Sequence, residues 1–151
     1  MKPRHAIILA IVIYPAVAHA APSKLLDALR YEESKNRNHV INYNRNGTRD
    51  LGPYQLNERY LDDFRWRYND GIQFDPFDYK QSRFIANAHL DAMRRSALSR
   101  DNDCGVAVKL SSWENIVCAW NCGMTRMLRG APQSSKDFAK RVLVRAGYAT
   151  K

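Results

Sequence analysis

The sequence of 151 residues lacks most features that would make it a metal protein, a repeat protein or a nucleic-acid binder. It has no internal repeat and no low-complexity tract, which excludes repeat architectures. The three cysteines are Cys104, Cys118 and Cys122, and neither His39 nor His89 stands at ligand-like spacing from them. We therefore expect no metal site and no cofactor. RNP-like, zinc-finger and P-loop patterns are also missing, so no nucleic-acid partner is expected.

The N-terminal stretch predicts export. Basic residues precede a short apolar run that ends in an A-x-A cleavage site at 18–20. Because Pro15 interrupts this run, residues 1–20 predict a secretory signal peptide rather than a transmembrane helix. The expected location is periplasmic or secreted, without stable membrane insertion after cleavage. Residues 21–151 are then expected to form one domain.

Acidic residues are scarce beside basic ones. Removing the two leader residues Lys2 and Arg4 from the 24 lysines and arginines leaves 22 against 15 acidic residues, a net charge of +7. A basic exported protein is drawn to anionic surfaces such as wall polymers. Export also permits a disulfide. Because Cys118 and Cys122 lie one turn apart on an expected helix, we predict a bridge from Cys104 to one of them, which leaves one thiol.

Apolar spacing indicates helices along most of the chain. They are expected at about 23–34, 54–68, 78–99 and 111–128, followed by a last helix from Ser135 to just before Gly147. Near 37–53 the Asn/Gly-rich sequence predicts a loop or short hairpin. The fold class is therefore mainly α.

The helix patterns also predict caps and inward-facing residues. The expected N-caps are Ser23, Ser111 (in a capping box with Glu114) and Ser135, and Gly147 is the expected C′ residue. Phe84 is expected to face inward on the third helix, and Trp120 on the fourth.

Residues 31–57 concentrate the polar groups that could perform chemistry. Glu33 lies roughly 30° from the middle of the apolar face of the first helix, whereas Glu32 lies about twice as far from it. An apolar surrounding disfavours the carboxylate, so Glu33 is the candidate general acid with a raised pKa. The amide side chains that follow both donate and accept hydrogen bonds, which suits hydroxyl and N-acetyl groups.

Two motifs resemble those of the lytic transglycosylases. Glu33-Ser34 is followed by an Asn-rich loop and by Asp50-x-Gly52-x-x-Gln55-Leu56-Asn57, which resembles the family's Glu-Ser and Asp-x-Gly-x-x-Gln-Ile-Asn elements. The stretch 119–123 (Ala-Trp-Asn-Cys-Gly) resembles the family's Ala-Tyr-Asn-Ala-Gly element. Both motifs occur in the expected order, and the match as a whole covers most of 25–142. The resemblance implies a small lysozyme-like domain, similar to goose-type lysozyme, over 21–151.

The resemblance also implies an activity and partners. Members of the family cleave the β-1,4 bond between N-acetylmuramic acid and N-acetylglucosamine in peptidoglycan, and they form 1,6-anhydromuramyl products without water. A single Glu serves as acid and then as base. The small exported form most resembles specialised members that open the wall for secretion machines, conjugation or phage entry. Peptidoglycan strands and components of such a machine are the implied partners.

The resemblance assigns roles residue by residue. Glu33 is the implied catalytic residue, and the implied substrate-contacting residues are Ser34, Tyr54, Gln55, Asn57, Trp120 and Asn121. Alternatives remain open for several of them. Ser34 orients Glu33 or caps the helix end, Gln55 and Asn57 contact sugar or cap the next helix, and Trp120 stacks on sugar or fills the core. Asn121 is expected to brace the loop below Glu33.

The sequence departs from the family pattern at Arg37-Asn38, where Asn-Pro is common, at Pro53-Tyr54, where an apolar pair is usual, and at Phe138. Phe138 stands where many members place a Tyr whose hydroxyl reaches the catalytic Glu, and the sequence leaves open whether Tyr43 or Tyr54 replaces it. Asp50 is expected to brace its loop rather than to activate water.

Two other functions remain open. A lysozyme-type muramidase would hydrolyse the same bond, with Asp50 or Glu32 positioning water. A non-catalytic wall-binding protein would keep the fold and bind peptidoglycan without cleaving it.

Overall fold

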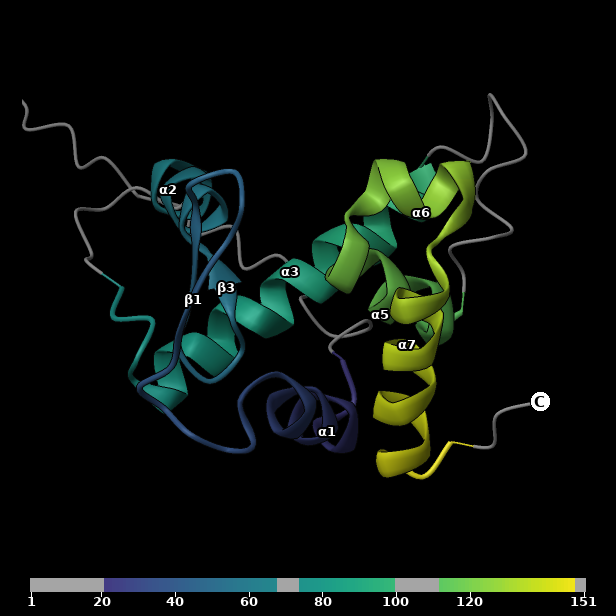
Figure 1. The fold of residues 1–151 in the computed structure, drawn as a ribbon, viewed down its shortest axis with the longest axis horizontal. Helices are drawn as coiled ribbons and strands as arrows, with labels where there is room; N and C mark the ends of the chain where they lie inside the picture. The colour runs from purple at the N-terminus through teal and green to yellow at the C-terminus, as the bar shows by residue number, and fades with distance from the viewer. Residues whose placement is uncertain (1–20, 68–73, 100–111, 149–151) are drawn as a thin grey trace, which may run out of the picture.

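The computed structural model describes residues 21–67, 74–99 and 112–148, and these are mainly helical with one small sheet (Figure 1). The predicted mainly α class is confirmed. The expected leader over 1–20, Ser111 and Cys104 lie outside the described ranges. The elements are α1 (Ser23–Ser34), β1 (Ile41–Tyr43), β2 (Arg49–Leu51), β3 (Leu56–Asn57), α2 (Glu58–Arg67), α3 (Tyr79–Ser99), α5 (Trp113–Cys122), α6 (Met124–Gly130) and α7 (Gln133–Arg145).

The long helix α3 connects two groups of elements. The sheet and α2 lie at one end of it, and α5, α6 and α7 lie at the other (Figure 1). Helix α7 packs against both α1 and α5, and α5 packs against α3. The helices α1, α3, α5 and α7 all contribute fully buried side chains to the core, including Leu25, Leu29, Ile85, Val117 and Val142. No helix in the described ranges is both long and apolar enough to cross a membrane.

All three expected N-caps are wrong. Ser112 rather than Ser111 caps α5, and its Oγ accepts from Asn115 N–H at 3.3 Å. Prolines occupy the cap positions of α1 and α7, namely Pro22 and Pro132, and neither provides a side-chain cap. Ser23 and Ser135 therefore lie inside α1 and α7, where their hydroxyls form hydrogen bonds with residues of other elements. Ser23 Oγ accepts from Arg83 Nη2 at 2.7 Å. Ser135 Oγ donates to Asn121 Oδ1 at 2.7 Å.

The predicted C′ glycine of the last helix is confirmed. Gly147 has φ 82°, a left-handed conformation that favours glycine. Its N–H donates to the carbonyl of Val144 at 3.1 Å, and Tyr148 N–H donates to that of Leu143 at 2.9 Å. This pair of bonds is a Schellman motif, which satisfies two of the last carbonyls of α7.

Two helix boundaries and one buried face differ from the prediction. The helix expected from residue 54 begins at Glu58, because Gln55 has φ 49° and the chain forms a turn and β3 first. Gly123 (φ 83°, ψ 149°) divides the helix expected over 111–128 into α5 and α6. Phe84 is 56% exposed rather than buried, and its ring packs at the surface beside Phe64 and Phe74.

The predicted hairpin is confirmed, and a third strand extends it. The antiparallel order is β1-β2-β3, with Asn42 opposite Asp50 and Asp50 opposite Asn57. Directly opposed residues share a face of the sheet, so these three polar side chains form one row. Asn44 N–H donates to the Thr48 carbonyl at 2.8 Å across a short turn in which Gly47 has φ 81°. A glycine in this conformation is typical of three-residue hairpin loops.

Gly52 provides a test of this architecture. A Cβ added there would lie 1.8 Å from the Pro76 carbonyl oxygen, and φ is 74°. We expect Gly52→Ala to lower the free energy of unfolding by about 3 kcal/mol or more, because overpacking adds to backbone strain. Gly47→Ala is the matched control, since φ is 81° but a Cβ would meet nothing within 4 Å. It should cost only about 1 kcal/mol. Urea unfolding measures both, and equal losses would contradict the close approach of Gly52 to Pro76.

Candidate active site

A cleft of about 570 Å³ lies between the sheet and the helices that carry the two motifs. The end of α1, the β1–β2 hairpin, β3, the start of α2, α3 and the end of α5 all contribute side chains. The lining consists of Glu33, Asn44, Asn46, Thr48, Asp50, Gln55, Leu56, Asn57, Arg59, Tyr60, His89, Trp120, Asn121, Cys122 and Gly123. The cleft thus brings together five of the residues predicted for the site, namely Glu33, Gln55, Asn57, Trp120 and Asn121. Ser34 and Tyr54 do not line it.

Glu33 projects into the cleft from the last turn of α1. Its Oε1 accepts a hydrogen bond from the indole Nε1 of Trp120 at 2.8 Å. Burial raises the pKa of Glu33 to about 7, and the nearby charges of Asp50 and Glu32 act in the same direction. The Trp120 N–H opposes this rise because it stabilises the carboxylate. Glu33 can therefore hold or release a proton near neutral pH.

The adjacent Glu32 has the opposite surroundings. Its side chain is only 5% exposed, but it is covered by three cations. Arg145 Nε lies 3.0 Å from Oε1, and Arg141 Nε and Lys35 Nζ lie 3.3 and 3.4 Å from Oε2. Burial alone would raise the pKa of Glu32, yet these cations outweigh it and lower the pKa. Glu32 remains a carboxylate and faces α7 instead of the cleft.

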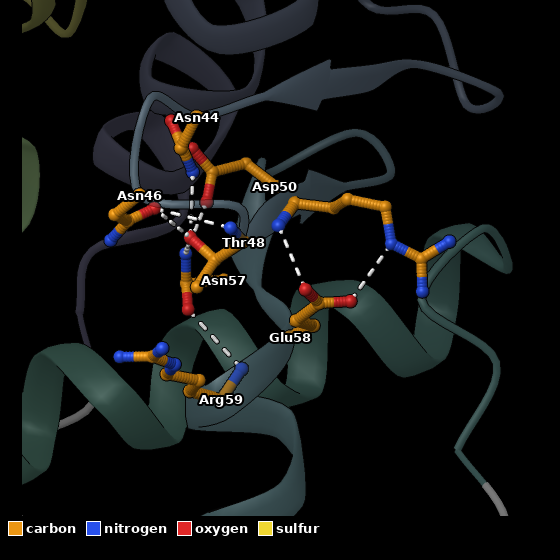
Figure 2. A network of polar contacts seen from close by, with 8 residues as sticks. Asn44, Asn46, Thr48, Asp50, Asn57, Glu58 and Arg59 are labelled. Carbon is orange, nitrogen blue, oxygen red and sulfur yellow. Dashed lines mark hydrogen bonds and ion pairs between the residues drawn. The ribbon is translucent and has the colours of Figure 1, made fainter.

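A network of hydrogen bonds among polar side chains builds the wall that carries Asp50 (Figure 2). Thr48 is its centre, and only 4% of this residue is exposed. Its hydroxyl donates to Asn46 Oδ1 at 2.8 Å and accepts from Asn44 Nδ2 at 3.2 Å and from Asn57 Nδ2 at 3.1 Å. Asn57 Nδ2 also donates to Asp50 Oδ1 at 2.7 Å. The network fixes one carboxylate oxygen of Asp50.

Gln55 braces the turn at the base of the cleft. Its Nε2 donates to the Gly52 carbonyl at 2.7 Å and to the Val40 carbonyl at 3.3 Å, and its Oε1 accepts from Asn42 Nδ2 at 2.7 Å. Both amide protons are therefore used within the protein. Asn57 is similarly occupied, because its Oδ1 accepts from Arg59 N–H at the start of α2. Both residues line the cleft, but their hydrogen bonds hold its walls.

Ser34 and Tyr54 have structural roles outside the cleft. Ser34 Oγ is buried and donates to the Arg30 carbonyl one turn back in α1 at 3.0 Å, whereas Lys35 is the C-cap of this helix. Tyr54 is fully buried, because the turn before β3 points it into the core, and its hydroxyl accepts from Arg83 Nη1 at 3.2 Å. Burial raises the pKa of Tyr54 to about 12. The substrate contact predicted for these two residues does not fit these positions.

The second motif contributes Trp120 and Asn121. Trp120 is half-buried: its ring packs against the core, while its N–H reaches Glu33. Asn121 Oδ1 accepts from Ser135, so Asn121 is tied to α7 rather than to the loop below Glu33 as predicted. Phe138, at the position of the family's Tyr, is buried in the core. Neither of the proposed replacements reaches the cleft, since Tyr43 is 79% exposed elsewhere and Tyr54 is buried. Trp120 supplies the side-chain donor to Glu33.

Three lining residues, Thr48, His89 and Tyr60, were not predicted as site residues. Thr48 lies within the Asn-rich loop, and its position between Asn46 and Asp50 was the available signal. His89 lies on α3 and Tyr60 on α2, and the centroids of their rings are 3.8 Å apart. The His89 ring also lies 5.3 Å from that of Trp120. Burial lowers the pKa of His89 to about 4, so the imidazole is neutral at physiological pH.

The expectations on metal binding and on a disulfide both concern the His, Cys, Asp and Glu side chains. The described ranges contain no group of three or more His, Cys, Asp or Glu side chains that could hold a metal ion. Cys118 and Cys122 form no disulfide with each other or with another described residue. Their predicted partner, Cys104, lies outside the described residues, so the bridge remains a prediction.

The raised pKa of Glu33 has a consequence for stability. Because the folded-state pKa (about 7) exceeds the ordinary value of 4.5, the folded protein keeps this proton while the unfolded chain loses it. Stability is therefore lost as pH rises from about 4.5 to 7, by roughly 3 kcal/mol in total. Glu33→Gln removes this loss, so its free energy of unfolding relative to wild type should be about 3 kcal/mol larger (more stable) at pH 8 than at pH 4.

Urea unfolding at the two pH values measures this difference. Glu32→Gln is the matched control, because the lowered pKa of Glu32 predicts the opposite sign: this variant should lose stability at pH 8 relative to wild type. A Glu33→Gln effect that does not change with pH would show that Glu33 ionises normally.

The chain has no significant match among known proteins, so its own chemistry is the basis for interpreting the site. No protein-family model matches the chain, and neither the curated proteins nor the solved structures contain a significant match. What the geometry provides is a carboxylic acid with a near-neutral pKa, a second carboxylate held by amides, and a polar cleft with an indole at its edge.

Proposed function

We propose that this protein is a peptidoglycan lytic transglycosylase. The observation that carries the proposal is Glu33, a carboxylic acid in a cleft whose pKa is raised to about 7 by burial. An acid-base catalyst works best when its pKa lies near the working pH, because it must both give and take a proton. The motif resemblance at 33–57 and 119–123 supplies the substrate class.

The cleft suits a chain of N-acetylated sugars. Asn44, Asn46 and Asn121 line it, and each uses only part of its amide for hydrogen bonds within the described residues. The remaining donors and acceptors match sugar hydroxyl and acetamido groups. Trp120 and Tyr60 add aromatic surface, on which the apolar face of a pyranose ring can pack.

Glu33 would perform both proton transfers. Trp120 occupies Oε1, so the transferable proton resides on Oε2. That proton passes to the glycosidic oxygen as the bond from muramyl C1 to this oxygen breaks. The muramyl 6-hydroxyl oxygen then bonds to C1, and its proton returns to the Glu33 carboxylate. The products are a 1,6-anhydromuramyl end and a free 4-hydroxyl, and no water is consumed.

Asp50 supports the alternative of a lysozyme-type hydrolase. It lines the same cleft, and its charge contributes to the raised pKa of Glu33. In a hydrolase it would activate water, as second carboxylates do. Against this, Asp50 Oδ1 is bound to Asn57 within the Thr48 network, which suits a bracing role. A non-catalytic wall-binding protein has no need for an acid with a near-neutral pKa.

The lysozyme-like fold and the cellular setting belong to the same proposal. The mainly helical domain with its short hairpin is compatible with a goose-type-lysozyme-like architecture. The leader expected at 1–20 would deliver the domain to the periplasm or outside the cell, where the wall is its substrate. Service to a secretion, conjugation or phage-entry machine follows from the resemblance to small exported members.

Glu33→Gln should abolish cleavage of purified sacculi and leave sacculus binding intact. General-acid catalysis contributes about 10²–10⁴-fold, so a loss of at least that size is expected. Release of soluble fragments from dye-labelled sacculi measures activity, and co-sedimentation measures binding. Glu32→Gln removes the adjacent carboxylate and should retain most of the activity, because Glu32 faces α7. Near-normal activity of Glu33→Gln together with an inactive Glu32→Gln would reverse the assignment.

Asp50→Asn separates the two enzyme classes. Asparagine keeps the acceptor that Asn57 needs, so a transglycosylase should keep partial activity and form only 1,6-anhydro products. A hydrolase would lose its water-activating group and become as inactive as Glu33→Gln. Mass spectrometry of the digests identifies the products, since hydrolysis adds one water per cleavage. Reducing muramic acid ends from wild type, combined with an inactive Asp50→Asn, would favour the lysozyme alternative.

A further inference from the structure

The cleft borders a second hollow of about 440 Å³ on α6. Cys122 and Gly123 line both spaces, so the two share one boundary at the junction of α5 and α6. Beyond this junction the lining comes from α6 and includes Arg126 and Arg129. A ligand that fills the cleft can therefore extend past Glu33 onto α6.

Gly123 places no side chain at this shared boundary. It ends α5 with φ 83°, and its N–H donates to the Ala119 carbonyl at 2.8 Å. A Cβ added at Gly123 would meet nothing within 4 Å, so the space above the backbone is unfilled. The chain turns here from α5 into α6 without placing a side chain between the two hollows.

The second hollow is cationic. Arg126 and Arg129 are three residues apart on α6, which places them on neighbouring positions of one helix face. Both are exposed, and neither forms a hydrogen bond or ion pair with another described residue. No acidic residue lines this hollow within the described ranges. By contrast, Arg49, Arg83 and Arg141 form ion pairs. Two guanidinium groups are thus available beside the cleft.

We propose that Arg126 and Arg129 bind the carboxylates of the stem peptides that peptidoglycan carries on its muramyl residues. This inference rests on the proposed function and adds a preference to it. The glycan itself has no charged group when its amino sugars are acetylated and its lactyl groups carry peptides, so the anionic part of the substrate is the peptide. Guanidinium forks match carboxylates with two parallel hydrogen bonds. The protein should therefore prefer strands that carry stem peptides over bare glycan.

The test compares two substrates and two double variants. The substrates are solubilised glycan strands with intact stem peptides and the same strands after an amidase has removed the peptides and the freed lactyl carboxylates have been converted to neutral methylamides. Arg126→Gln/Arg129→Gln should raise KM on peptide-bearing strands about tenfold with little change in kcat, and the effect should shrink at high salt. On peptide-free strands it should behave like wild type. The conservative variant Arg126→Lys/Arg129→Lys should recover part of the lost affinity.

Lys136→Gln/Lys140→Gln is the matched control, because it removes the same charge from the exposed surface of α7. An equal rise in KM from this control would show that the effect comes from the net charge of the protein, and it would overturn the proposal. So would equal losses on both substrates, or no loss on either, while wild type cleaves both. If wild type cleaves neither substrate, the proposed function fails first and this inference fails with it.

Discussion

The site depends on the removal of one carboxylic acid from water. Glu33 lies one turn beyond Leu29 on α1, so the helix that anchors the core also carries the acid to the edge of that core. Burial raises its pKa by disfavouring the charged form. The adjacent residues Glu32 and Glu33 thereby acquire opposite properties. Glu32 stays a carboxylate because three cations surround it, whereas Glu33 can exchange a proton. The difference arises from what packs against each carboxylate, since their chemistry is identical.

The second constraint is that the cleft must be polar and yet rigid. A wall of Asn, Gln and Thr side chains achieves this because amides and hydroxyls satisfy one another's hydrogen bonds. Thr48 makes three of these bonds and is almost completely buried, so the hairpin tip cannot shift without breaking several of them. Gly52 fixes the base of the hairpin by its close approach to Pro76. The amide atoms that are not used internally are left facing the cleft.

The sequence predicted the elements and the acid better than the contacts. Helical periodicity located the helices, and the angle of Glu33 to the apolar face identified the carboxylate with the raised pKa. The failures have local causes. Proline cap positions shifted Ser23 and Ser135 into their helices, and the positive φ of Gln55 turned Tyr54 into the core. His89 and Tyr60 were missed because their role depends on how α2 and α3 pack together, which no local pattern encodes.

The side-chain donor to Glu33 is an indole N–H, and an indole constrains the proton of the acid differently from a hydroxyl. A tyrosine hydroxyl both donates and accepts, so it can bond either the carboxylate or the protonated acid by rotating its hydrogen. The indole N–H of Trp120 can only donate. It therefore bonds an oxygen that carries no proton in both states of Glu33, and the acid's proton is confined to the other oxygen. Because His89 packs against the Trp120 ring, and Tyr60 packs against His89, the direction of the indole is set by ring packing across the cleft. The packing of three tilted rings thus sets which oxygen of Glu33 faces the cleft.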